Sequence, residues 1–206
     1  MPSTTDSPQH RPISITTATD ADRAAIYRAR HEVFARELGQ HQVNPQGRLT
    51  DKLDAFNDYL VARHRGCLAG FVSITPPGHG AYAIDKYLDR AELPFACDDA
   101  LYEVRLLTVL PAHRHRPIAG LLMYAALRWI ESRGGTRILA IGRHEVLGLY
   151  RKVGLRLLGR EVAAGAVRFE LMTGMVRELG ERLAGNARYM RIVGRWLDRH
   201  AWSVAP

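Results

Sequence analysis

The chain has 206 residues, of which 47% are hydrophobic and 24% are charged, a composition ordinary for one folded domain with a sizeable core. No stretch approaches the roughly 20 apolar residues of a membrane span, and the polar start MPSTTDSPQHRP lacks the apolar region of a secretory signal. The net charge of +8 comes almost wholly from arginine and favours anionic partners such as nucleotide phosphates, an acidic carrier protein or nucleic acid. Cys67 and Cys97 form no metal-binding spacing, so we expect no metal and two ordinary thiols in a reducing cytoplasm.

Alternating apolar residues, helix caps and turn residues predict the order of the elements. The first half predicts a disordered lead over residues 1–11, a strand over 13–18, a helix over 21–38 capped by Asp20, a loop over 40–57 and a hairpin of strands over 58–63 and 67–75. The second half predicts a short helix near 84–91, a central strand over 101–110, a helix over 117–133, a strand over 136–142, a short helix over 144–153 and a hairpin over 155–162 and 166–172. This order predicts a mixed α/β domain over residues 12–173, and the amphipathic tail predicts a helical extension over 174–206.

The most informative segment is the central strand with the basic loop and the helix that follow it. The first N–H groups of a helix have no partner within the helix, and the helix dipole adds positive potential at that end. Together these features form an anion site suited to a pyrophosphate, and the side chains of Arg114, His115 and Arg116 would supplement it. Many strand–turn–helix units bind no anion, so this segment alone leaves the question open.

The stretch from this strand to LYRKVGL, residues 149–155, resembles the GNAT acyltransferase superfamily. The resemblance implies a mixed, mostly antiparallel sheet with helices on both faces and two strands splayed apart to hold pantetheine. It implies that the strand backbone binds the pantetheine amides and that the basic turn binds the pyrophosphate of the donor, through Leu107, Thr108, Val109, Arg114, His115, Arg116, Ile118, Ala119 and Gly120. Pro117 replaces the middle glycine of the family's turn and removes one N–H donor, a change that an acyl carrier protein would tolerate better than coenzyme A.

The opening helix is similar to that of the acyl-homoserine-lactone synthases and N-acyl amino acid synthases. Their Arg-x-x-Val-Phe motif falls on Arg30 and Phe34, their paired aspartates on DKLDAF, residues 51–56, and their Glu-x-Ser-Arg strand on YEVRLLTV, residues 102–109. Arg105 stands one place before the expected arginine, so we expect it to face the other side of the strand. Leu49 and Ser73 replace two further charged residues of the pattern. We therefore expect the family's ionic network to be largely missing and homoserine-lactone production to be absent.

The resemblance also suggests catalytic and acceptor residues. Glu103 is a candidate base for the amine proton, with an ion pair to a nearby arginine as its alternative role. His144 is a second candidate base, or equally an exposed residue at a helix start. Tyr150 is the candidate acid that protonates the leaving thiolate, although a tyrosine at such a position is often a packing residue. Acceptor contacts are expected from Arg30, Phe34, Tyr82 and Arg105, with packing as their alternative role.

Three functions therefore compete. The first is an N-acyltransferase of specialised metabolism that moves an acyl group from acyl carrier protein or acyl-coenzyme A to a small-molecule amine. The second is an aminoacyl-tRNA-dependent transferase, whose binding would weaken steeply with salt. The third is a non-catalytic ligand-binding module with a degenerate donor site. A monomer or a homodimer, without membrane association, is expected in each case.

Overall fold

The computed structural model of the chain describes residues 13–197, so the predicted disordered lead over residues 1–11 lies outside the described part. The described residues contain one seven-stranded sheet in the order β1-β2-β3-β4-β5-β7-β6. Its strands are β1 (Ser14–Thr17), β2 (Asp58–His64), β3 (Cys67–Thr75), β4 (Leu101–Val109), β5 (Arg137–Arg143), β6 (Arg156–Ala164) and β7 (Val167–Met175). Neighbouring strands are antiparallel except β4 and β5, which run parallel. The predicted mixed sheet is confirmed.

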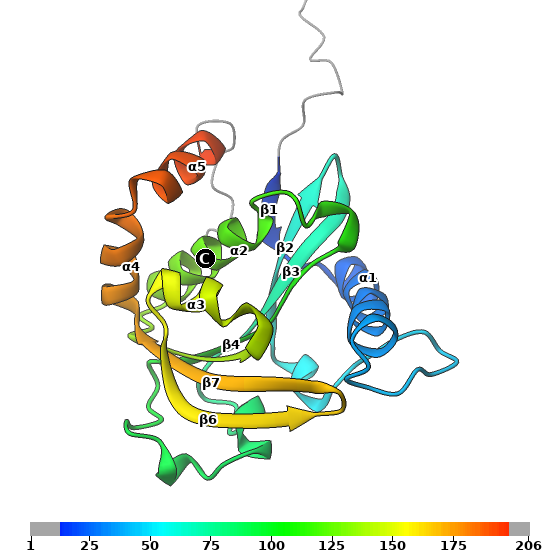
Figure 1. Ribbon diagram of the computed structural model, residues 1–206, viewed down its shortest axis with the longest axis horizontal. Coiled ribbons are helices and arrows are strands. Elements are labelled where there is room, and N and C mark those ends of the chain that lie inside the picture. Colours follow the sequence, from blue (N-terminus) through cyan, green and yellow to red (C-terminus); the bar gives the residue numbers. More distant parts are fainter. Residues whose placement is uncertain (1–12, 198–206) are drawn as a thin grey trace, which may run out of the picture.

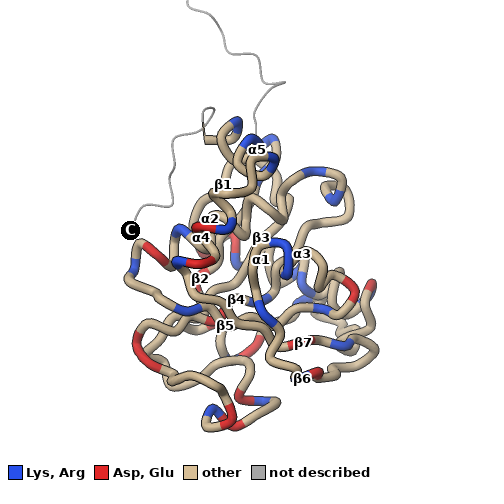
Figure 2. Tube along the Cα trace, turned by 60° about the vertical axis from the view of Figure 1, so that its left-hand side comes forward, with Lys and Arg blue, Asp and Glu red and all other residues tan. Residues whose placement is uncertain are grey.

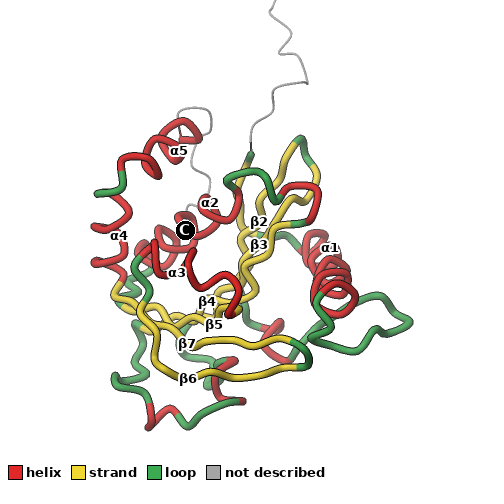
Figure 3. The backbone as a smooth tube through the Cα atoms, in the orientation of Figure 1, coloured by secondary structure: helices red, strands yellow, loops and turns green. Residues whose placement is uncertain are grey.

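Helices cover both faces of the sheet, with α1 on one face and α2 to α5 on the other (Figures 1 and 3). The α-helices are α1 (Asp20–Arg30), α2 (Ile118–Ser132), α3 (Leu147–Val153), α4 (Val176–Ala184) and α5 (Ala187–Leu197). The shorter helices are the π-helix η2 (His31–Glu37) and the 3-10 helices η3 (Lys52–Ala55), η4 (Ala83–Lys86), η5 (Arg90–Glu92), η6 (Pro111–His113) and η7 (His144–Val146). Within residues 13–197, no helix is both long and apolar enough to cross a membrane.

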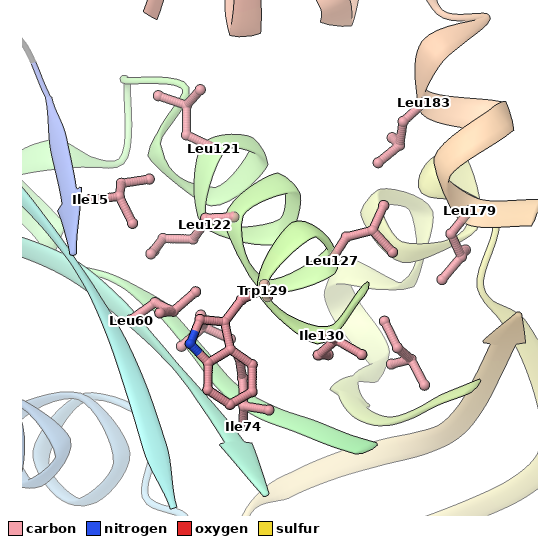
Figure 4. Close-up of a cluster of buried hydrophobic side chains, with 14 of the residues drawn as sticks. Ile15, Leu60, Ile74, Leu121, Leu122, Leu127, Trp129, Ile130, Leu179 and Leu183 are labelled. Carbon is pink, nitrogen blue, oxygen red and sulfur yellow. The ribbon is translucent and has the colours of Figure 1, made fainter. Parts of the chain in front are cut away.

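The largest apolar core lies between α2 and the sheet (Figure 4). Trp129 and Leu122 of α2 are almost fully buried there, close to Leu60 and Ile74 of β2 and β3. Helix α4 continues this core with buried leucines, among them Leu183. Burial of a large apolar side chain contributes about 1.5–3 kcal/mol to folding, so this layer holds α2 and α4 against the strands.

The opening helix begins with a capping box formed by Thr19 and Asp22. The backbone N–H of Thr19 donates to Asp22 Oδ2 at 2.8 Å, and the N–H of Asp22 donates to Thr19 Oγ1 at 3.3 Å. Thr19 has extended φ/ψ angles, as a cap residue requires, whereas the predicted cap Asp20 is already helical, so that prediction was wrong by one residue. The helix passes into η2 and ends before Gly39, whose φ of 62° suits glycine.

The central strand β4 contains a bulge at Leu106. Phe71 pairs with Thr108 and Ser73 pairs with Arg105, so β4 holds one residue more than β3 over this interval. Leu106 takes up the extra residue with a φ of 56°. A bulge changes which residues share a face, because the alternation of side chains restarts after it.

Beyond the bulge, β4 and β5 separate. Their pairing runs from Leu101 opposite Arg137 to Val104 opposite Ala140 and is not found further along the described strands. Strand β4 continues in register with β3 as far as Val109, whereas β5 continues with β7. Each strand therefore follows a different neighbour, and the sheet opens at the position predicted for the donor.

The two C-terminal helices pack on the α2 side of the domain. The hydroxyl of Tyr189 on α5 donates to the carbonyl of Gly120 at 2.8 Å, and Trp196 Nε1 donates to the carbonyl of Ile13 beside β1. Helix α5 carries three arginines and no acidic residue, so a basic surface extends over this end of the molecule (Figure 2). The two predicted helical segments of the tail are confirmed, with their break at Gly185–Asn186.

Candidate active site

A cavity of about 380 Å³ occupies the opening of the sheet. Its walls come from β4, β5, the start of α2, α3 and the segment from α1 to residue 51. The β4 part of the wall is formed by Leu106, Leu107, Thr108 and Val109, and the last three are the strand positions predicted to hold the donor.

The backbone of β4 presents polar groups towards this cavity. The N–H of Leu110 donates to the carbonyl of Ala69 on β3 at 2.9 Å. Because successive N–H groups alternate in direction along a strand, the N–H of Val109 points away from β3 and towards the opening. The Val109 carbonyl is already used, since it accepts a hydrogen bond from Arg114 Nε at 3.2 Å.

The predicted basic turn meets one end of the cavity. Arg114, Arg116 and Ala119 line it, whereas His115 is exposed outside it, Ile118 is buried in the core and Gly120 contacts Tyr189 of α5. Arg114 Nη2 donates to Glu37 Oε2 at 2.7 Å, and this bond holds the pKa of the Glu37 carboxyl below its ordinary value. Arg116 has no acidic partner among the described residues, so its charge is available to an anion.

Tyr150 of α3 lies across the cavity from β4 and is 9% exposed. Burial raises the pKa of its hydroxyl to about 12, although nearby Arg143 acts in the opposite direction. The ring rests against the backbone of Gly142, where an added Cβ would lie 2.5 Å from Tyr150 Cε2. Tyr150 is therefore a positioned, protonated phenol at neutral pH.

An ion-pair network joins α1, the loop before η3 and β4. Arg30 Nη2 donates to Asp51 Oδ2 at 3.0 Å, and Arg30 Nη1 donates to Asp54 Oδ1 at 2.8 Å. Arg105 binds both oxygens of Asp51, with Nη1–Oδ2 at 2.9 Å and Nη2–Oδ1 at 3.0 Å. Tyr59 Oη also donates to Asp54 Oδ1, at 2.6 Å.

This network corrects two sequence predictions. The network was expected to be largely missing, and Arg105 was expected to face away from it. The bulge explains the error, because Leu106 packs with the apolar cluster on the α1 face, the same side on which Arg105 meets Asp51. Arg105 thus reaches the aspartate from one position earlier in the strand, and both Arg30 and Arg105 line the cavity while paired.

Glu103 does not line the cavity. Its side chain is fully buried, and its oxygens accept hydrogen bonds from the N–H groups of Ala83 at 2.7 Å and Ile84 at 3.0 Å. Burial raises the pKa of this carboxyl, despite those bonds and the charge of Arg105. Glu103 therefore fastens the start of η4 to β4, and no arginine ion pair with it is found among the described residues.

The other predicted residues divide between the cavity and its surroundings. Phe34, which was predicted to contact the acceptor, lines the cavity from η2. Tyr82 does not line it, since its hydroxyl donates to the Leu101 carbonyl at 2.8 Å behind β4. His144 begins η7 with a side chain 54% exposed and likewise stands outside the cavity.

Comparison with known proteins identifies the family. The model of the acetyltransferase (GNAT) family matches residues 23–155, more than half of the chain. The chain belongs to the GNAT family. As a GNAT protein it is an acyltransferase, and the family match includes the opened strand, the basic turn and Tyr150. A search of curated proteins finds no match.

Solved structures show how widely the GNAT fold of this chain is shared. The CoA-dependent acyl-homoserine lactone synthase MesI is 16% identical with a TM-score of 0.65, over 93% of this chain and 99% of that one. The CoA-dependent acyl-homoserine lactone synthase BjaI, solved with SAM and isopentyl-CoA, is 18% identical with a TM-score of 0.68, over 91% of this chain and 89% of that one. The AHL synthase LasI is 15% identical with a TM-score of 0.67, over 81% of this chain and 90% of that one.

Sequence reasoning did not propose Glu37, His41, Lys86 or Arg143 for the site, although all four line this GNAT cavity. His41 lies in the segment between α1 and β2, and Lys86 lies in η4. Neither segment has a regular pattern that indicates the direction of a side chain. Arg143 ends β5, and the parallel register of β5 with β4 would have placed it beside the opening.

Proposed function

We propose that this GNAT enzyme transfers an acyl group from a phosphopantetheine thioester to the amine of a small molecule. The observation that carries the proposal is the opening between β4 and β5 beside Leu107–Val109, with the phenol of Tyr150 on its far side. A strand edge without a partner strand can bind the amide groups of a pantetheine arm.

The charge around the opening favours an anionic donor. The N–H groups of Ile118, Ala119 and Gly120 begin α2 and have no partner within that helix. Arg116 lies beside them without an acidic partner among the described residues. Both coenzyme A and a carrier protein present a phosphopantetheine phosphate to such a site, so the two donors share the chemistry recognised here. Pro117 removes one donor N–H before α2 and favours the donor with fewer phosphates, the carrier protein.

The bond changes require no acyl-enzyme intermediate. The neutral amine attacks the thioester carbonyl carbon, forming the C–N bond, and the N–H of Val109 stabilises the oxyanion. The C–S bond then breaks, the nitrogen gives up one proton to a base or to solvent as the amide forms, and the phenol of Tyr150 gives its proton to the leaving thiolate and is reprotonated from solvent. A thiol with a pKa near 8.5 is already a fair leaving group, so this proton transfer contributes modestly.

A small apolar cavity of about 50 Å³ adjoins the main one and supports a short acyl chain. Leu107, Ile141 and Tyr150 border both cavities, and Met123 of α2 and Leu183 of α4 form part of the far wall. Because these walls are packed apolar side chains, an acyl chain of a few carbons would fit without rearrangement, and a longer one would displace them.

The acceptor side is cationic. Asp51 already neutralises much of Arg30 and Arg105. Lys86 lines the cavity without an ion pair among the described residues, and Arg143 has only the exposed Glu145, 3.9 Å from its Nη1. An amine that also carries a carboxylate or another anionic group matches this charge. The acyl-homoserine lactone synthases compared above share the fold of this chain. We therefore propose the class of acceptor from the charged residues that line the cavity of this chain, and not from those enzymes.

A mass-spectrometric assay tests the proposed function. The purified protein is incubated with acetyl-, butyryl- and octanoyl-coenzyme A, with the same acyl groups on acyl carrier protein, and with aminoacyl-tRNA, each against the standard amino acids and a set of polyamines. An N-acyl product from a coenzyme A or carrier donor supports the proposal. Product from aminoacyl-tRNA alone, sensitive to ribonuclease, supports the tRNA-dependent function instead. No product with any donor, together with unchanged melting temperature on adding the donors, would support a non-catalytic module.

A further inference from the structure

Acyl transfer to an amine requires a proton acceptor at the acceptor side of the cavity. The nitrogen loses a proton as the C–N bond forms, and a positioned base typically accelerates this step 10²- to 10⁴-fold. Three described side chains that line the cavity could accept a proton near neutral pH, and these are Glu37, His41 and Asp51. Their surroundings differ sharply.

The two carboxylates are held as anions by arginines. Glu37 accepts a hydrogen bond from Arg114 at 2.7 Å. Asp51 accepts from Arg105 with both oxygens and from Arg30 with one. Burial alone would raise the pKa of Asp51, but the bonds and charges of the two arginines outweigh burial and lower it. A carboxylate with such a low pKa is a poor proton acceptor.

His41 differs from both carboxylates. It lies in the loop after η2, and its backbone N–H donates to the carbonyl of Phe34 at 3.2 Å. The loop is fixed from the other side as well, because the N–H of Ala166 in the β6–β7 turn donates to the Gly39 carbonyl at 3.3 Å. His41 has no ion pair among the described residues and lines the cavity at a rim exposed to solvent.

The charges that act on His41 favour the neutral imidazole. Loss of water around the ring lowers the pKa of His41, the cations of Arg30 and Lys86 lower it further, and Asp51 acts in the opposite direction. An ordinary histidine has a pKa near 6.5, so a lowered value leaves the ring unprotonated and able to accept a proton at pH 7.

We infer that His41 is the general base that takes the proton from the acceptor amine. The inference rests on the proposed function. As the amine nitrogen bonds to the thioester carbon, its proton passes to an imidazole nitrogen of His41 and the C–S electron pair leaves with the thiolate, which takes the proton of Tyr150. Loss of the His41 proton to solvent at the exposed rim and reprotonation of Tyr150 then restore the enzyme. The products are one amide and one thiol.

The test measures kcat and donor KM against pH for wild type, His41→Asn and His41→Gln, with butyryl-coenzyme A, butyryl-carrier protein and the best amine from the mass-spectrometric assay. His79→Asn is the matched control, because His79 is exposed, stacks on Phe56 with ring centroids 4.6 Å apart and does not line the cavity. We expect both His41 variants to lose at least about 100-fold in kcat at pH 7 with donor KM little changed. The acid limb of the wild-type profile should disappear, and added imidazole should restore part of the rate.

Two results would overturn the assignment of His41. One is that both His41 variants have the same kcat as wild type and the same acid limb in the pH profile of kcat. The other is an equal loss of kcat in His79→Asn. Melting curves of each variant identify any loss caused by unfolding, and an NMR titration of wild type is expected to show a pKa of the His41 ring below the ordinary value near 6.5. If wild type itself forms no product, the proposed function fails, whereas active wild type with active His41 variants sinks this inference alone.

Discussion

Asp51 and Arg105 form a bidentate ion pair that joins the loop before η3 to the central strand β4. Its two nitrogen–oxygen distances are 2.9 and 3.0 Å. The same carboxylate binds Arg30 at the end of α1. One aspartate therefore compensates two arginines that line the cavity. It holds α1 and β4, the two sides of the acceptor region, in a fixed relation.

Asp51→Asn should lower the free energy of unfolding by about 3 kcal/mol. This value is the lower end of the range for breaking a buried ion pair, and we choose it because Arg30 would still have Asp54 as a partner. Urea denaturation at pH 7 measures the loss. Glu181→Gln is the matched control, since Glu181 pairs with Arg177 on the exposed face of α4 and should contribute only about 0.3–0.5 kcal/mol. Equal losses in the two variants would mean that the network does not stabilise the fold.

The same pair predicts a pH dependence. The pKa of Asp51 is lower in the folded protein than the value near 3.9 expected of the unfolded chain. Its stabilising contribution is therefore complete above about pH 4–5 and is lost as the pH falls towards the folded pKa. Unfolding curves between pH 7 and pH 3 should show wild type and Asp51→Asn converging in acid. A difference between them that stays constant with pH would contradict this account.

Regular periodicity made most of the fold predictable. Each predicted strand and each predicted α-helix is present within a few residues, because apolar spacing, glycine turns and proline stops act locally. The cap of α1 was displaced by one residue because Thr19 and Asp20 are both good caps, and only the reciprocal bonds of Asp22 decide between them.

The side chains of the site were harder to predict than the elements. The face of Arg105 depends on the bulge at Leu106, and nothing in the local residue types indicates a positive φ at a leucine. Glu103 was proposed as a base from the family pattern, but its partners Ala83 and Ile84 lie in an irregular segment about 20 residues away. Contacts of this kind depend on tertiary packing, which periodicity does not encode.

Tyr150→Phe should lower kcat by roughly 10- to 100-fold, at or below the low end of general-acid effects, and change donor KM little. The phenol has a pKa raised to about 12, so it stays protonated at neutral pH and should cause no alkaline loss of activity below about pH 10. Both kcat and donor KM are measured from the rate at which free thiol is released. Tyr102→Phe is the control, since Tyr102 is buried against Trp129, lines neither cavity and donates to the Arg133 carbonyl. An unchanged kcat in Tyr150→Phe would remove the phenol from the mechanism.

Gly142→Ala should reduce turnover without touching a polar group. The new Cβ would lie 2.5 Å from both Tyr150 Cε2 and Met172 Cε, so the ring must move, and we expect a stability loss of about 1–3 kcal/mol. Gly148→Ala in α3 meets nothing within 4 Å and should stabilise by up to about 1 kcal/mol. Thermal unfolding and kcat are compared for both. If Gly142→Ala keeps full kcat, the position of the Tyr150 ring is not important for turnover.

Met123→Ala should shift the donor preference towards longer acyl chains. Met123 of α2 forms part of the wall of the small apolar cavity, and removing its thioether enlarges that cavity. Each additional methylene buried there would contribute about 0.8 kcal/mol, so the ratio of kcat/KM for hexanoyl over butyryl donors should rise by roughly tenfold. Leu121→Ala is the control, because Leu121 is buried on the same helix but lines neither cavity, and it should lower stability without changing the ratio. An equal ratio in wild type and Met123→Ala would show that the acyl chain lies elsewhere.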